Sequence, residues 1–112
     1  MSQPQSVLHS LMAIIEDRKR NPPARSYTTT LFQGGVDRIG AKITEEAAEL
    51  IEAARESSPE ARAHLVHEAA DLIYHVLVLL GYREVTLAEV EAELARRQGI
   101  SGLDEKESRG TA

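Results

Sequence analysis

The sequence contains no cysteine and no tryptophan, and only one phenylalanine and three tyrosines occur among its 112 residues. Without cysteine there can be no disulfide framework, no thiolate metal site and no cysteine nucleophile. Alanine and leucine supply most of the apolar side chains, which favours helices over a sheet. The length is that of one domain, so we expect residues 1–112 to form a single all-α domain with a polar tail at 100–112.

Positive charge and long apolar runs are also scarce. The chain has 13 Lys and Arg against 18 Asp and Glu, a formal net charge of −5, and no block of basic residues. Because phosphate neutralisation supplies most non-specific affinity for nucleic acids, we expect no nucleic-acid partner. The longest stretch without a polar residue, Val76 to Leu80, is far shorter than the roughly 18 residues that cross a bilayer. We therefore expect no membrane segment and a cytoplasmic location.

Apolar residues recur with a helical period along most of the chain, which predicts four to five helices. Residues 7–20 form the first, which ends before Pro22. The segment from Ser26 to Thr30 has the β-branched content of a strand, but no second alternating strand follows Gly35. A short helix capped by Ser26 is the better interpretation.

Two long helices follow, and we expect them to form an antiparallel hairpin. The first runs from about residue 36 to 56, and the second from about Pro59, with Ser58 as its cap, to Leu80 before Gly81. Thr86 and Glu89 have the spacing of a capping box and open a last helix that reaches Arg97.

The second hairpin helix is apolar nearly all the way round between residues 69 and 80. A chain of this size buries only a limited fraction of its surface, so one copy has too little protein to cover such a helix. We infer a homodimer in which the two hairpin helices build the shared core. The alternative is a monomer with a long apolar groove.

Two pairs of carboxylates stand out, Glu46-x-x-Glu49 on the first hairpin helix and Glu68-x-x-Asp71 on the second. On a helical wheel, Glu46 falls between the apolar Leu50 and Ala53, and Asp71 interrupts an otherwise apolar stretch. An isolated carboxylate is costly in such a place. An antiparallel hairpin brings the two pairs opposite each other.

Four facing carboxylates repel one another unless a divalent cation neutralises them. Oxygen ligands favour Mg²⁺, with Mn²⁺ as the second choice. His64 and His75 lie on the same stripe and leave zinc or iron open, although the Glu-x-x-His spacing of di-iron bundles is absent. The purely structural alternative is that Asp71 pairs with a cation such as Lys42 or Arg38.

The pattern Glu46-Ala-Ala-Glu49, eighteen residues, Glu68-Ala-Ala-Asp71 resembles the signature of the all-α nucleoside triphosphate pyrophosphohydrolase superfamily. The surrounding segments resemble its phosphoribosyl-ATP pyrophosphohydrolase family: Lys42-Ile-Thr-Glu-Glu-Ala-Ala-Glu49, Glu68-Ala-Ala-Asp-Leu-Ile-Tyr-His75, Ser26-Tyr-Thr28, and the tail motif Ser101-Gly-Leu-Asp-Glu-Lys-Glu-Ser-Arg109. Thr44 departs from this pattern, since a small residue such as glycine is expected there.

This resemblance implies Mg²⁺-dependent hydrolysis of 1-(5-phosphoribosyl)-ATP to 1-(5-phosphoribosyl)-AMP and pyrophosphate, a step of histidine biosynthesis. The catalytic and metal-binding residues that it implies are Glu46, Glu49, Glu68 and Asp71. The substrate-binding residues that it implies are Lys42, His75, Lys106 and Arg109. Two alternatives remain open: a sister pyrophosphohydrolase that acts on dUTP or non-standard nucleotides, and a non-enzymatic helical dimer that serves as an adaptor.

Overall fold

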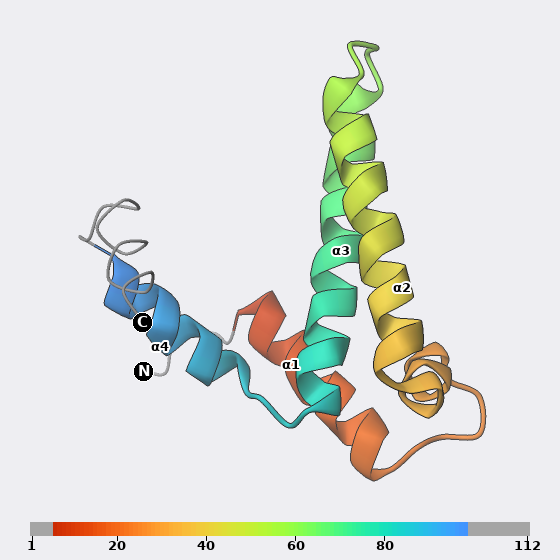
Figure 1. The fold of residues 1–112 in the computed structure, drawn as a ribbon, viewed down its shortest axis with the longest axis vertical. Coiled ribbons are helices and arrows are strands. Elements are labelled where there is room, and N and C mark those ends of the chain that lie inside the picture. Colours follow the sequence, from red (N-terminus) through yellow and green to blue (C-terminus); the bar gives the residue numbers. More distant parts are fainter. Residues whose placement is uncertain (1–5, 99–112) are drawn as a thin grey trace.

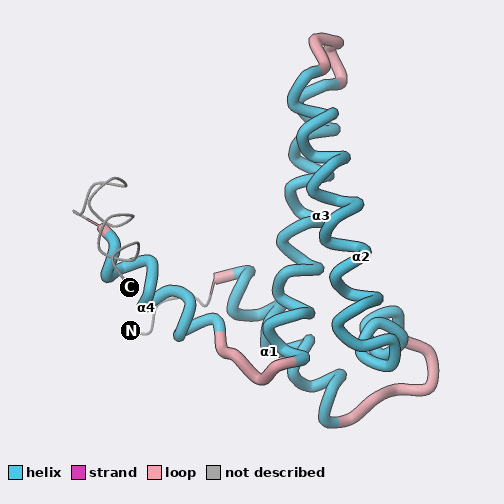
Figure 2. The backbone as a smooth tube through the Cα atoms, in the orientation of Figure 1, coloured by secondary structure: helices cyan, strands magenta, loops and turns pink. Residues whose placement is uncertain are grey.

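The computed structural model describes residues 6–98, and this part of the chain contains four helices and no strand. The helices are α1 (Val7–Arg20), α2 (Tyr27–Arg55), α3 (Ala61–Tyr82) and α4 (Leu87–Arg97). Long α2 and α3 run antiparallel, α1 crosses the base of this hairpin, and α4 extends to one side (Figures 1 and 2). The expectations of an all-α fold and of an antiparallel hairpin are confirmed.

Helix α2 consists of two helical segments joined at Gly35. Ser26 caps the first segment by accepting a hydrogen bond from the Thr29 backbone at 3.2 Å. Gly35 then adopts φ 71° and ψ −164°, which interrupts the helix. Side chains rarely tolerate this conformation, so glycine allows the bend. The short helix capped by Ser26 is therefore confirmed, and the strand alternative is wrong.

Replacing Gly35 with alanine is expected to lower the free energy of unfolding by about 1–3 kcal/mol, because a Cβ atom is strained at this φ and ψ. The matched control is Gly40→Ala, since Gly40 is helical and has no atom within 4 Å of the added Cβ. That control should stabilise the protein by up to about 1 kcal/mol. Urea denaturation of both variants measures the difference, and equal stabilities would show that the bend is not strained.

Helix α3 differs at both ends from the sequence expectation. It begins at Ala61, so Pro59 precedes the helix, and its N-cap Glu60 makes no side-chain capping bond. At the other end it continues through Gly81 to Tyr82. Gly81 is buried, and a Cβ there would lie 3.1 Å from Ile15 on α1. Its small size serves close packing between the helices, and it does not end the helix.

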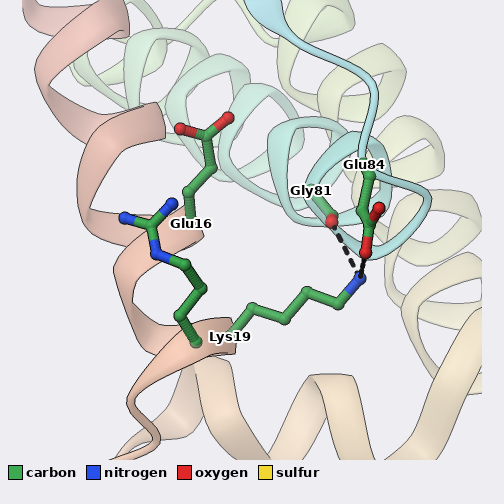
Figure 3. A pocket seen from close by; sticks show the side chains of 5 residues that line it. Glu16, Lys19, Gly81 and Glu84 are labelled. Carbon is green, nitrogen blue, oxygen red and sulfur yellow. Dashed lines mark hydrogen bonds and ion pairs between the residues drawn. The ribbon is translucent and has the colours of Figure 1, made fainter.

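The C-terminal end of α3 is instead held by Lys19 of α1. The Lys19 ammonium donates to the Tyr82 carbonyl at 2.7 Å. It also lies 3.4 Å from both the Gly81 carbonyl and the Glu84 carboxylate (Figure 3). Glu84 itself takes the positive φ of 60° at the turn. The carbonyls at the end of a helix carry partial negative charge, so a lysine is favourable there. A small pocket of about 210 Å³ surrounds these groups, and we assign it this structural role.

The apolar core lies where α1 crosses the base of the hairpin. Its largest fully buried side chains are Ile15, Leu31, Ile39 and Val78. Helix α4 begins with the capping box of Thr86 and Glu89, as expected. Figure 1 shows the distal half of the α2/α3 hairpin projecting beyond α1 and α4, so the other described helices leave that half uncovered.

One described helix, α3, is long and apolar enough to cross a membrane by length and composition alone. Core helices of soluble proteins pass the same test, so one such helix is weak evidence for a membrane span. Two of the residues that α3 buries, Glu68 and His75, are polar.

Candidate metal centre

The hairpin brings the two predicted carboxylate pairs to the same place. Helix α2 carries Glu46 and Glu49, and the antiparallel α3 carries Glu68 and Asp71. Glu46 interacts electrostatically with Asp71 across the hairpin. Glu49 and Glu68 line one open groove of about 420 Å³ between the helices. The two predicted pairs therefore lie on facing sides of α2 and α3, one pair on each helix.

Two carboxylate oxygens at this place are buried without a partner. Glu46 is 5% exposed and Glu68 is 7% exposed. The Oε2 atom of each has no hydrogen-bond partner. Buried polar atoms are nearly always paired, and a buried anion is costly unless a cation compensates it. These oxygens and their acidic neighbours fit a divalent cation that prefers oxygen ligands.

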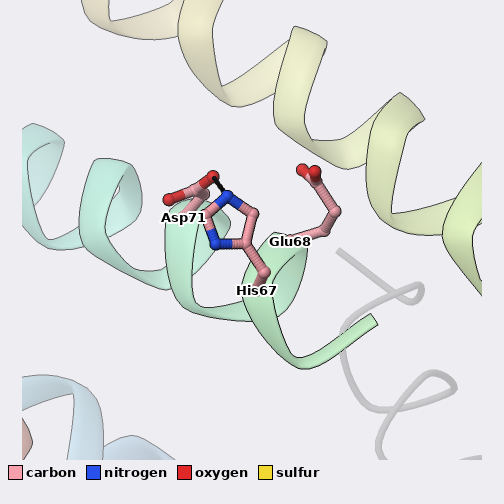
Figure 4. Close-up of side chains that lie close together, drawn as sticks. All are labelled: His67, Glu68 and Asp71. Carbon is pink, nitrogen blue, oxygen red and sulfur yellow. Dashed lines mark ion pairs between the residues drawn. The ribbon is translucent and has the colours of Figure 1, made fainter. Parts of the chain in front are cut away.

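The candidate metal ligands form one closely spaced group on each helix. Two groups of residues have candidate ligand atoms within 4.8 Å of one another: Glu45, Glu46 and Glu49 on α2, and His67, Glu68 and Asp71 on α3. Figure 4 shows Glu68 reaching towards α2 while His67 pairs with Asp71. We refer to these two groups, one on each helix, as the acidic cluster.

Burial raises the pKa of the Glu46 carboxyl from its ordinary value of 4.5 to about 7, and the nearby Asp71 and Glu49 add to the rise. The Lys42 ammonium, 3.8 Å from Glu46 Oε1, opposes it. Without a cation, the Glu46 carboxyl therefore takes up a proton as the pH falls through about 7. A bound divalent cation would replace that proton.

This pKa predicts that the metal-free protein loses stability as the pH rises. A carboxyl whose pKa is higher in the folded state stabilises the fold fully below its unfolded pKa, and this contribution is lost between 4.5 and about 7. We expect the free energy of unfolding in EDTA to fall by roughly 2 kcal/mol between about pH 5 and pH 8 from this group. Urea denaturation of the wild type and of Glu46→Gln measures it. The variant should lack this part of the decrease, and an equal slope in both proteins would contradict the assignment.

Lys42 lies beside the acidic cluster, as expected from its place one turn before Glu46. Its ammonium is 3.4 Å from both carboxylate oxygens of Glu45. Although partial desolvation opposes the change, the hydrogen bond to Glu45 and the nearby negative charges raise the pKa of Lys42. Asp71 pairs with His67, 3.2 Å away. Within the described residues, the alternative pairing of Asp71 with Lys42 or Arg38 is not found.

His75 is buried, 4% exposed, and both of its ring nitrogens are engaged. Nδ1 lies 2.9 Å from the Asp71 backbone carbonyl, and Nε2 lies 3.0 Å from the Tyr27 hydroxyl. A carbonyl only accepts, so we assign the hydrogen to Nδ1, and the hydroxyl of Tyr27 donates to Nε2. A hydrogen bond between the Thr28 and Tyr74 hydroxyls reinforces this contact. His75 therefore fastens the first turn of α2 to the helix that carries Asp71, and a contact with substrate stays a prediction.

His64 joins the end of α2 to the site. Its Nδ1 lies 2.9 Å from Glu56 Oε1, and its Nε2 lies 3.3 Å from Glu68 Oε1. Its hydrogen bond to Glu56 and the neighbouring Glu68 raise the pKa of the His64 imidazole, against a smaller effect of desolvation.

Three further residues, which no sequence pattern had assigned, contact the site: Tyr27, Glu56 and His67. A signal existed only for His67, which precedes Asp71 by one helical turn. Tyr27 and Glu56 contact His75 and His64 on the other helix, and no local sequence pattern predicts these contacts. Lys106 and Arg109, the two predicted substrate contacts in the tail, lie outside the described residues.

Comparison with known proteins identifies the family. The family model for phosphoribosyl-ATP pyrophosphohydrolase matches residues 8–98. A phosphoribosyl-ATP pyrophosphatase of Rhodopirellula baltica is 53% identical over 95% of this chain and 90% of its own. Proteins of the same name from Dechloromonas aromatica and Cereibacter sphaeroides are 48% and 50% identical, each over 94% of this chain and over 94% and 99% of their own. The chain belongs to the phosphoribosyl-ATP pyrophosphohydrolase family.

Proposed function

We propose that this protein hydrolyses 1-(5-phosphoribosyl)-ATP to 1-(5-phosphoribosyl)-AMP and pyrophosphate, a step of histidine biosynthesis, with Mg²⁺ bound by Glu46, Glu49, Glu68 and Asp71. The observation that carries the proposal is the pair of buried, unpartnered oxygens of Glu46 and Glu68 in a chain of this family. Mn²⁺ is the second choice of cation, because the facing ligands are oxygens.

The reaction transfers a phosphoryl group to water. The water oxygen attacks the α-phosphorus, the bond from that phosphorus to the bridging oxygen breaks, and pyrophosphate leaves with the electron pair. A carboxylate of the cluster accepts the proton of the water, and Glu45 or one of the four ligands can do so. When bound, Mg²⁺ neutralises phosphate oxygens and lowers the pKa of a coordinated water.

Lys42 is the cation of the described chain that is placed to meet a phosphate oxygen beside the site. It lies within 4 Å of Glu45 and Glu46 and remains part-exposed. An ammonium there stabilises negative charge that develops on the departing pyrophosphate. Under this proposal Lys106 and Arg109 bind the additional ribosyl phosphate, which a simple nucleoside triphosphate lacks.

The proposal includes a homodimer built on the hairpin. Exposed apolar residues follow α3 at spacings of three or four: Ala63, Val66, Ala70, Ile73 and Val76. Val66 is 64% exposed and Ile73 is 44% exposed. Such a stripe on one helix is typical of a helix–helix interface, and a second copy of the hairpin has the matching stripe. Light scattering should give twice the chain mass of 12.3 kDa. The chain mass itself would favour a monomer with an exposed groove.

A cytoplasmic location and the lack of a nucleic-acid partner complete the proposal. The chain contains no cysteine and has a net charge of −5. The lack of cysteine suits a reducing compartment. The negative net charge disfavours binding to the phosphate backbone of a nucleic acid.

The decisive experiment measures pyrophosphate release by the purified protein from 1-(5-phosphoribosyl)-ATP, with dUTP and ATP as competing candidates. We expect release from the first substrate in Mg²⁺ and none in EDTA. Release from dUTP alone would favour the sister pyrophosphohydrolase.

Thermal unfolding separates the enzyme from a helical adaptor. Mg²⁺ that binds only the folded state stabilises it by about 2.7 kcal/mol at a concentration one hundred times its dissociation constant. An adaptor whose carboxylates are satisfied by lysine and arginine should show no such rise in melting temperature with Mg²⁺.

A further inference from the structure

Three of the four proposed ligands have a basic or imidazole side chain one helical turn before them. Lys42 Nζ is 3.8 Å from Glu46 Oε1, His64 Nε2 is 3.3 Å from Glu68 Oε1, and His67 Nε2 is 3.2 Å from Asp71 Oδ2. Residues four apart lie on the same side of a helix, which explains the repeated contact. In Glu46 and Glu68 the partner holds one oxygen and leaves the buried Oε2 atom free.

His64 differs from the other two because its own orientation is fixed. The Glu56 carboxylate, at the C-terminal end of α2, holds Nδ1 at 2.9 Å, so Nε2 is directed towards Glu68. Lys42 is a flexible side chain that also contacts Glu45, and the side chain of His67 is 69% exposed. The chain of contacts from Glu56 through His64 to Glu68 therefore spans the hairpin turn.

We propose that His64 is a positioning residue, which holds Glu68 Oε1 through Nε2, is itself oriented by Glu56, and so directs Glu68 Oε2 towards the divalent cation. This inference rests on the proposed function, because it takes Glu68 as a ligand. A glutamate side chain has several rotamers, and ordering one of them costs conformational entropy. A ligand that is already ordered by a neighbouring hydrogen bond does not incur that cost when the cation binds.

If the charge of His64 alone mattered, removing His64 would change the Mg²⁺ affinity in the opposite direction. A positive imidazole beside a ligand repels a divalent cation, so its removal would strengthen binding if charge alone mattered. Orientation predicts weaker binding after removal. The sign of the change in Mg²⁺ affinity therefore distinguishes the two effects.

The test is the dissociation constant of Mg²⁺ alone, measured by calorimetric titration of the full chain without substrate. Changes in groups that orient metal ligands typically weaken binding about 10- to 100-fold, and we expect about 10-fold for His64→Ala. Glu56→Ala, which keeps the imidazole but removes its anchor, should weaken binding in the same direction by a smaller factor. His64→Gln, which retains a side-chain N–H donor at this position, should recover part of the affinity.

The matched control is His9→Ala. His9 also pairs with a glutamate, at 2.8 Å from Glu91, but this pair joins α1 to α4 away from the hairpin groove. We expect the control to leave the Mg²⁺ dissociation constant unchanged. An unchanged or tighter dissociation constant in both His64→Ala and Glu56→Ala would overturn the inference. Failure of the wild type to bind Mg²⁺ would instead refute the proposed function on which it rests.

Discussion

Glu68→Gln is expected to reduce pyrophosphate release from 1-(5-phosphoribosyl)-ATP by at least about 100-fold, because a neutral amide replaces a charged ligand. The same change should leave the metal-free protein as stable as the wild type or more stable. It removes a negative charge that is buried with a free oxygen beside Asp71. Steady-state kinetics in Mg²⁺ and urea denaturation in EDTA measure the two effects on one preparation.

The control for this variant is Glu91→Gln on α4. Glu91 is an exposed glutamate that pairs with His9 and lies outside the hairpin groove. Its substitution should change neither quantity appreciably. If Glu68→Gln instead unfolds while the control folds, Glu68 is part of a structural ion pair, and the metal-binding interpretation fails. Full activity of Glu68→Gln would remove this residue from the ligand set.

Ile39→Ala is expected to lower the free energy of unfolding by about 2–5 kcal/mol. Ile39 is fully buried in the core together with Leu31 and Val78. Removing its side-chain methyl and methylene groups loses their burial and leaves a cavity, because the three packed helices relax only in part. Urea denaturation, with the midpoint and slope fitted separately, measures the loss.

Ile14→Ala is the matched comparison, because this isoleucine on α1 is 50% exposed. Its substitution should cost less than about 1 kcal/mol, since half of its surface already contacts solvent. Equal losses for Ile14 and Ile39 would contradict the position of the core at the base of the hairpin. A small loss for both would mean that contacts outside the described chain supply most of the stability.

The helices could be predicted from local sequence, but their ends could not be predicted equally well. Ser26 and Thr86 cap helices as expected, because a side-chain cap depends on residues three positions away. The expectation that Gly81 ends α3 was wrong, because its small size is required by Ile15 of α1. Packing against a distant helix decides that position, and the residues beside Gly81 carry no sign of it.

In the acidic site, too, local sequence predicts some features, while contacts with distant residues decide others. The spacing of Glu46 to Glu49 and of Glu68 to Asp71 predicts two pairs that face each other, and the structure places them together. The burial of Glu46 also follows from its apolar neighbours on the wheel. The contact of His75 with Tyr27 did not follow, because 48 residues separate the two in sequence. A helical period shows which side of a helix a residue occupies, and it does not identify the partner on that side.

The bend at Gly35 allows α2 to contact α3 twice near the site, through Glu46 beside Asp71 and through Tyr27 at His75. With Glu46 beside Asp71, a straight α2 would carry its first turn well past Tyr82, where α3 ends. At about 1.5 Å per residue, the stretch before the bend would overshoot by more than a full turn. Because the chain folds back there, Tyr27 returns to His75, beside the turn that bears Asp71. A single glycine thus allows the first segment of α2, which would otherwise extend beyond the end of α3, to pack against α3.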